Sequence, residues 1–381
     1  NGSSGRFDTM TIDESAGDVG RYTSMAVDSQ GRVHVSYYAH RTNLTADGNT
    51  VEVTGPMYAR SKTPAPASAS DWDIIPIEQV ASCSNACGTA QACVDDDGPT
   101  CVLASEACES CECGQLCVNS GSGATCMTEM PRGFSKPCGG SCPDGTVCVS
   151  DGADGNVCMA PAVGCEQECG SGQQCVDDGS GNVSCVILTP YSGIEGYLEG
   201  VGLFTSLAIQ DDNPVVVYYD AIRGHLRGAI AQFTTAGALS SGFAVGPVAC
   251  HPGDDVGQHA SLAVSADGNS IGVAYQALAG ETLWAFTGTD IFDAGGTHTE
   301  VDDGFRASSI HLVGGGADAA FTSSGDLVIA YGDQTDNDLV IAFPDGDSWG
   351  YSTLLSDGAY GSFPALAVDG NQAWVATYKR A

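Results

Sequence analysis

The sequence predicts an all-β protein, a five-bladed β-propeller that carries an inserted disulfide-rich domain. A short phrase, GRYTSMAVD at 20–28, recurs as GLFTSLAIQ at 202–210, GQHASLAVS at 257–265 and GSFPALAVD at 361–369, with a weaker copy, GADAAFTSS, at 316–324. A polar turn and a second apolar run ending near tyrosine follow each copy, and no stretch shows helical periodicity with caps. A pair of strands that recurs five times along the chain indicates a repeat architecture.

Two further strands complete most of the repeats. The expected third strands are 56–62, 226–233, 283–288 and 338–343, and the expected fourth strands are 72–80, 242–248, 298–303 and 349–355. Copies that begin at Gly202, Gly257, Gly316 and Gly361 stand 55, 59 and 45 residues apart. Four strands within such a spacing are typical of a propeller blade.

The fifth repeat has only its first two strands before Ala381. We expect the N-terminal segment RFDTMTIDE at 6–14 to pair beside these strands and close the ring. The last blade then either has three strands or takes one from another chain, because an open sheet edge accepts an added strand.

The repeats resemble the SLAVDxxGxxxVxYYD-type propeller repeats of secreted bacterial proteins, over residues 6–80 and 190–381. The resemblance implies the propeller fold and a secreted bacterial protein. It implies no particular activity, because propellers host many functions.

The charge balance excludes several classes of partner. The chain has 13 Lys and Arg against 47 Asp and Glu, a formal net charge of −34. Such a surface repels nucleic acid and anionic lipid, and it favours divalent cations or a cationic protein surface. No apolar run is long enough for a transmembrane helix.

Cysteine usage defines the insert and the compartment. Seventeen of the 18 cysteines lie within 83–185, so we expect domains at 1–80, 81–188 and 189–381. The cysteines are Cys83, Cys87, Cys93, Cys101, Cys108, Cys111, Cys113, Cys117, Cys126, Cys138, Cys142, Cys148, Cys158, Cys165, Cys169, Cys175, Cys185 and Cys250. They form four modules that loosely resemble truncated EGF-like repeats. Disulfides are favoured over a zinc site, since the insert has no histidine, and they predict a secreted, extracellular or cell-surface protein.

The second module has one cysteine too many, because Cys108 and Cys111 compete for its first position. Cys250 is the only cysteine of the propeller and lies, like the insert, in a link between blades. We expect Cys250 to pair with Cys108 or Cys111 and to clamp the insert to that face. The alternative is a free Cys250.

Acidic loops and sequons supply candidate ligand and modification sites. Calcium is the expected cofactor, with Asp333, Asp336 and Asp338 in one loop and Asp151 and Asp154 in another, since carboxylate oxygens at alternate positions suit Ca²⁺. Neither loop is a complete twelve-residue calcium loop, and polar turns are the alternative. Glycosylation of a glycoprotein is expected at the sequons Asn1, Asn43 and Asn182.

No catalytic motif is evident. Asp220 and Asp333 follow second strands at equivalent positions, and Asp28 lies on the opposite rim. Turn capping is the favoured role of all three, over a set of channel carboxylates in a glycosidase. Boxes of the GxSxG, HExxH and SxDxGxxW types, and an arginine cluster, are missing.

Three functions follow from these observations. The leading hypothesis is a non-catalytic extracellular structural or interaction protein, a filament subunit that assembles head-to-tail with itself by strand exchange; it is not expected to be an enzyme. The first alternative is a propeller that binds a surface carbohydrate, protein or other ligand, as a lectin or adhesin does. The second is a glycoside hydrolase or lyase with carboxylates in the central channel.

Overall fold

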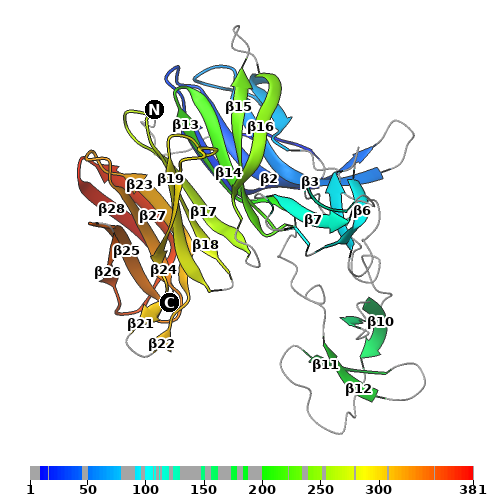
Figure 1. The fold of residues 1–381 in the computed structure, drawn as a ribbon. Coiled ribbons are helices and arrows are strands. Elements are labelled where there is room, and N and C mark those ends of the chain that lie inside the picture. The colour runs from blue at the N-terminus through cyan, green and yellow to red at the C-terminus, as the bar shows by residue number, and fades with distance from the viewer. Residues whose placement is uncertain are drawn as a thin grey trace. The chain divides into compact units, whose positions relative to one another are not determined.

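The computed structural model (Figure 1) describes residues 9–15, 17–44, 50–78, 91–95, 99–105, 107–108, 111, 114–119, 123–128, 147–150, 156–161, 173–177, 183–187, 200–221, 223–233, 239–250, 255–278, 280–306, 309–346 and 348–380. The chain divides into two compact units. The first contains residues 1–80, 110–115 and 200–381, and the second contains 81–109 and 116–199.

The first unit consists of antiparallel sheets whose strands follow chain order. Blade 1 is β1 (Gly17–Val27), β2 (Val33–Leu44), β3 (Thr50–Ser61) and β4 (Trp72–Pro76), with the short 3-10 helix η1 (Ala69–Asp71) before β4. Blade 2 is β13 (Val201–Gln210), β14 (Asn213–Asp220), β15 (His225–Phe233) and β16 (Leu239–Ala249). Blade 3 is β17 (Val256–Val264), β18 (Ile271–Ala277), β19 (Thr282–Gly288) and β20 (Thr297–Asp302). Blade 4 is β23 (Val313–Phe321), β24 (Leu327–Asp333), β25 (Asp338–Asp345) and β26 (Ser348–Leu355).

The C-terminal sheet has two strands, β27 (Ala359–Asp369) and β28 (Gln372–Arg380). The link from blade 3 to blade 4 contains the small hairpin of β21 (Phe305–Arg306) and β22 (Ser309–Ile310). The all-β prediction is therefore confirmed, and the predicted third and fourth strands appear with bounds within six residues of those expected. No helix among the described residues is long and apolar enough to cross a membrane.

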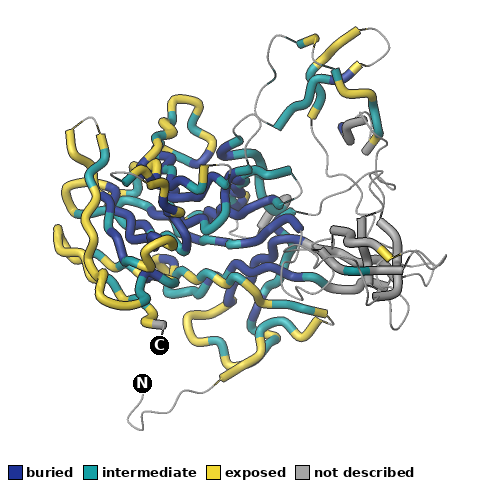
Figure 2. The backbone as a smooth tube through the Cα atoms, turned by 90° about the horizontal axis from the view of Figure 1, so that it is seen from below, coloured by how far each residue is buried: buried dark blue, intermediate teal, exposed yellow. Residues whose placement is uncertain are grey.

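The core lies where neighbouring sheets face each other. The second strands β18 and β24 are buried along their whole length, and Figure 2 shows buried backbone through the middle of the sheets with exposed backbone at their margins. Tyr218, Tyr275 and Tyr331 are fully buried. Burial of an apolar side chain of this size contributes roughly 1.5–3 kcal/mol, so these positions fix the stacking of the blades.

The recurring phrase has one backbone conformation in every copy. Its first residue is a glycine with positive φ, from +80° at Gly361 to +114° at Gly257, and the paired register slips next to it. The fourth copy begins at Gly314 (φ +86°), so the predicted start at Gly316 is wrong by two residues. Gly314, Gly315 and Gly316 stand in succession, so the sequence does not show which of them begins the copy.

A hydrogen bond from the same position of each phrase joins each blade to the next. Ser24 Oγ accepts from the Leu207 N–H at 3.0 Å, Ser206 Oγ from Leu262 at 2.9 Å, and Ser261 Oγ from Ala319 at 3.0 Å. Asp318 Oδ2 accepts from Leu366 at 2.7 Å. We call these four bonds the inter-blade latch. The fifth copy has Ala365 at this position, which offers no side-chain acceptor.

Closure of the ring is not seen in the part of the chain that the structure describes. Residues 9–15 form no strand, so over these residues the predicted closing strand is wrong; its first residues lie outside the described ranges. Ile12 packs against the core of blade 1, and Asp13 Oδ2 accepts a 2.6 Å hydrogen bond from the Tyr37 hydroxyl. These contacts hold the N-terminal segment against blade 1 and away from a pairing with β28.

The second unit is built of short hairpins. Its described strands are β5 (Gln91–Asp95), β6 (Pro99–Ala104), β7 (Gln115–Asn119), β8 (Ala124–Thr128), β9 (Val147–Ser150), β10 (Asn156–Pro161), β11 (Gln173–Asp177) and β12 (Val183–Ile187). In three hairpins the last two cysteines of a module stand directly opposite, as Cys93↔Cys101, Cys148↔Cys158 and Cys175↔Cys185. A module of this size buries little apolar surface, so cross-links are needed to hold it.

The described cysteines are all in disulfides, and one pair, Cys108–Cys117, is bonded at 2.01 Å. Cys108 is thereby removed from the two partners predicted for Cys250. Cys111 and Cys250 are both disulfide-bonded and belong to the propeller unit. A Cys111–Cys250 clamp stays a prediction, and a free Cys250 is excluded.

Candidate functional site

The third residue of the phrase holds a row of aromatic rings. Tyr22, Phe204 and His259 occupy this position in the first three blades and are partly exposed. Their ring centroids are 4.6 Å apart for Tyr22 and Phe204 and 4.5 Å apart for Phe204 and His259. We call these three side chains the aromatic row. It runs across the first strands of three neighbouring blades, so it forms one continuous apolar surface.

The backbone beneath the row is strained. Tyr22, Phe204 and His259 have φ of 53°, 51° and 53°, in the left-handed region that bulky residues avoid. Such a conformation costs on the order of 1 kcal/mol or more per residue. Blade 4 has Gly316 (φ 64°) at the same position, so the fold itself is satisfied by glycine there. The aromatic side chains are therefore not required by the backbone conformation at this position.

The row is uncharged at neutral pH. Burial alone lowers the pKa of His259 to about 4, because a desolvated imidazole favours its neutral form. His259 thus contributes a neutral aromatic face beside Phe204 over the whole physiological range.

Two tyrosines lie behind the row. Tyr38 pairs with Arg21 and Tyr219 pairs with Leu203, the residues just before Tyr22 and Phe204. The Tyr219 hydroxyl donates to Asp255 Oδ2 at 2.8 Å. The Tyr38 hydroxyl is fully buried and, among the described residues, has no hydrogen-bond partner. An apolar surface with a few polar groups nearby is the usual composition of a small-molecule site.

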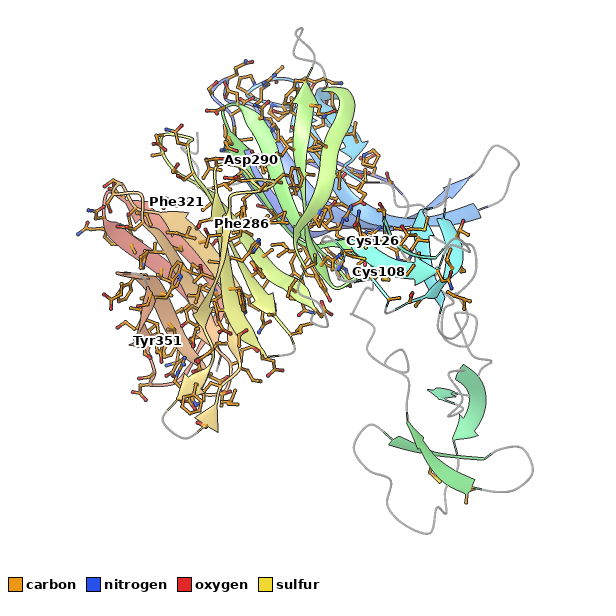
Figure 3. The ribbon with its side chains drawn as sticks, viewed as in Figure 1. Cys108, Cys126, Phe286, Asp290, Phe321 and Tyr351 are labelled. Carbon is orange, nitrogen blue, oxygen red and sulfur yellow. A yellow bond between two sulfur atoms is a disulfide. The ribbon has the colours of Figure 1, made fainter. Side chains whose placement is uncertain are left out.

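A second cluster lies at the junction of blades 3 and 4, where the link between these blades begins. The Tyr331 hydroxyl donates to Asp302 Oδ2 at 2.6 Å, and Arg306 donates to both Asp302 oxygens at 2.9 and 2.8 Å. Figure 3 labels Tyr351 on β26, whose ring lies 4.5 Å from the guanidinium carbon of Arg306. Burial raises the pKa of Asp302, but these hydrogen bonds outweigh it and hold that pKa below its usual value.

Blades 1 and 2 share an equivalent arrangement. The Tyr218 hydroxyl donates to Glu78 Oε2, and Arg227 donates to both Glu78 oxygens at 3.1 and 2.8 Å. As at the junction of blades 3 and 4, the carboxylate lies at or just beyond the end of the fourth strand of one blade, while the tyrosine belongs to the second strand of the next. Repetition at two blade junctions indicates that this tyrosine–carboxylate–arginine tie has a structural role.

Blade 4 adds groups that blade 2 lacks. His311 Nδ1 is 2.7 Å from Asp333 Oδ2 and 3.8 Å from Asp336 Oδ2. The pKa of Asp338 is raised, by burial and by the nearby Asp336 and Asp333 carboxylates. The structure thus brings together the three acids expected for calcium and adds His311, which spacing alone did not indicate.

Asp28, Asp220 and Asp333 all cap turns, as predicted. Asp28 Oδ1 accepts from the backbone of Gln30 and Arg32, Asp220 Oδ1 from the backbone N–H three residues on, and Asp333 Oδ1 from the two N–H groups of its own turn. The other expected sites are less informative. Asp151, Asp154, Asn1 and Asn182 lie outside the described residues, and Asn43 lies in β2 opposite Val51.

Asp28 also anchors a buried network that makes stability depend on pH. Its Oδ2 accepts from Arg32 Nε at 2.7 Å and lies 3.1 Å from His34 Nε2. Burial raises the pKa of Asp28, but the hydrogen bonds from Arg32 and His34 outweigh burial and lower it from 3.8 to about 2.

Asp28→Asn is therefore expected to remove part of the acid sensitivity of the fold. A lowered folded-state pKa stabilises the protein above the unfolded value near 4, and that stability is lost as pH falls towards 2. The shift corresponds to about 2 kcal/mol. Urea unfolding at pH 6 and pH 3 measures this contribution. The difference in unfolding free energy between wild type and Asp28→Asn should be smaller at pH 3 than at pH 6, and an equal difference at both pH values would contradict the assignment.

The sequence contained the signal for the aromatic row, since four of the five phrase copies have Tyr, Phe or His at the third position, with Phe363 in the fifth copy. It was not recognised because the left-handed conformation of that position does not follow from strand periodicity.

No protein-family model and no curated protein sequence matches the chain. Several solved structures are similar to it. A Dyadobacter fermentans protein of unknown function is 12% identical (TM-score 0.35), with 97% of this chain and 93% of that chain covered. The NanB sialidase of Streptococcus pneumoniae (K499G mutant) is 13% identical (TM-score 0.34; 94% and 65% covered). The Penicillium chrysogenum alpha-L-arabinanase is 11% identical (TM-score 0.36; 97% of both chains covered).

These findings correct two expectations. Sialidases and an arabinanase are among the similar structures, so the hypothesis of a non-catalytic filament subunit, and the expectation that the protein is not an enzyme, are wrong and are abandoned. At these identities and TM-scores no substrate or catalytic residue is transferred to this chain. The alternative of a carbohydrate-directed propeller is the one retained.

Proposed function

We propose that the propeller is a carbohydrate-active protein that binds a neutral glycan over the aromatic row. The observation that carries this proposal is the strained, partly exposed line of Tyr22, Phe204 and His259, which the backbone does not need. Flat aromatic faces pack well against the apolar C–H faces of sugar rings, and hydroxyl and carboxylate groups nearby supply hydrogen bonds.

The net charge restricts the class of glycan. With a formal charge of −34, the surface repels carboxylated and sulfated sugars. Neutral His259 adds no positive charge to the row. We therefore propose uncharged hexoses, pentoses or their oligomers as ligands, bound outside the producing cell, where disulfides persist.

The five phrase copies support a ring of five blades in which β27 and β28 belong to the fifth. Because Ala365 lacks the latch acceptor, the proposed junction between the fifth blade and β1 closes without that hydrogen bond.

A glycan array with neutral and anionic oligosaccharides tests the proposal. We expect saturable binding to a subset of neutral glycans and none to sialylated or sulfated ones. Mass spectrometry of each bound glycan after incubation then reports whether a glycosidic bond is cleaved. Binding confined to anionic glycans, or absent throughout, would contradict the proposed site.

A further inference from the structure

The charge balance differs sharply between the two tyrosine–carboxylate–arginine ties. In blade 2, the carboxylates of Glu78 and Asp220 are matched by the guanidinium groups of Arg227 and Arg223. In blade 4, Arg306 is the one arginine, and it is already committed to both oxygens of Asp302. The carboxylates of this partly buried group therefore outnumber its arginines, whereas carboxylates and arginines are equal in number at the blade 2 tie.

The acids in excess over arginine are Asp333, Asp336 and Asp338. Arg306 Nη2 is 3.8 Å from Asp333 Oδ2, beyond hydrogen-bond distance. The Asp333 side chain is only 5% exposed, so water screens its charge poorly. Of the cationic side chains near Asp333, Arg306 is shared with Asp302, and His311 carries a positive charge only when it is protonated.

The donor atoms are already close together. His311 Nδ1, one oxygen of Asp333 and one oxygen of Asp336 all lie within 4.8 Å of one another. The other ring nitrogen, Nε2, lies 3.1 Å from Ser309 Oγ, so an Nε2–H that donates to this oxygen leaves the Nδ1 lone pair free towards the carboxylates. The Asp336 side chain is 59% exposed, which opens the group to solvent on one side.

We propose that His311, Asp333 and Asp336 bind one divalent cation of the zinc class. Separations of 2.7 and 3.8 Å from Nδ1 to the two oxygens fit ligands on a sphere of about 2 Å radius, the usual Zn–N and Zn–O distance. A nitrogen ligand favours Zn²⁺ or Mn²⁺ over Ca²⁺, which prefers six to eight oxygens. Three protein ligands leave a fourth position to water on the exposed side.

Isothermal titration of the intact, oxidised protein with ZnCl₂, MnCl₂ and CaCl₂ tests this site. We expect one Zn²⁺ site that is at least tenfold tighter than any Ca²⁺ binding. Asp336→Asn should weaken Zn²⁺ binding at least tenfold. Because Asp336 is exposed, the variant should fold normally, and its metal-free unfolding temperature should equal that of wild type. His311→Ala should weaken Zn²⁺ at least as much.

Asp345→Asn is the matched control, because Asp345 is an exposed carboxylate of the same blade and the substitution removes the same charge. Its Zn²⁺ affinity should stay within twofold of wild type. The proposal is overturned by the absence of saturable Zn²⁺ binding, by equal weakening in Asp336→Asn and Asp345→Asn, or by Ca²⁺ binding that is tighter than Zn²⁺ binding and unaffected by His311→Ala.

Discussion

Replacing Asp318 by alanine is expected to lower the free energy of unfolding by about 3 kcal/mol, because the Leu366 N–H and the Ser261 hydroxyl both lose their acceptor. Asp318 accepts from the Leu366 and Ala319 N–H groups and from the Ser261 hydroxyl. The bond to Leu366 is the latch that ties β27 to blade 4. Loss of this latch should release the C-terminal sheet before the remaining blades.

Urea unfolding with intact disulfides measures this effect. Ser206→Ala removes the acceptor of a single N–H, that of Leu262, and should lower the free energy of unfolding by less, about 1–2 kcal/mol. Asp345→Ala, an exposed carboxylate in the same blade, should change stability by less than about 0.5 kcal/mol. If Asp318→Ala is no more harmful than Asp345→Ala, the latch does not hold the blades together.

Phe204→Gly is expected to weaken glycan binding at least tenfold, because it removes the central ring of the aromatic row. It should also be more stable than Phe204→Ala by about 1 kcal/mol, since glycine adopts φ of 51° without strain whereas alanine does not. Glycine is ordinarily the worse residue in a strand, so the reversed order is diagnostic of the strained backbone.

The matched control is Phe305→Ala, which removes an exposed ring in β21, outside the row. Its glycan affinity should equal that of wild type. Thermal unfolding of the two Phe204 variants and titration with an array-positive glycan give both readouts. Equal stability of Phe204→Gly and Phe204→Ala would argue against backbone strain at the row.

The strand plan could be predicted from the sequence because alternation and tyrosine-ended runs report directly on half-buried and buried strands. The position of each residue within the repeat could be predicted only where the copy of the phrase closely matched the others. At Gly314, Gly315 and Gly316 the side chains carry no pattern, and only the left-handed backbone and the latch at Asp318 fix the alignment.

Contacts between distant segments were not predictable in the same way. The sequence pattern of Ile12 and Asp13 predicts a strand, yet packing against the core of blade 1 and a hydrogen bond from the Tyr37 hydroxyl hold them outside any sheet. His311 joins Asp333 because the hairpin of β21 and β22 folds back on its own link. Local patterns define elements, whereas such sites depend on how loops from separate strands converge.

Saturation-transfer difference NMR with an array-positive neutral glycan tests the central claim most directly. With the wild-type protein, the axial C–H protons of the sugar should receive the strongest transfer, because they lie on the rings of Tyr22, Phe204 and His259. With Phe204→Gly, that transfer should fall to background while Phe305→Ala retains it. Undiminished transfer in Phe204→Gly would place the glycan elsewhere and contradict the proposed site.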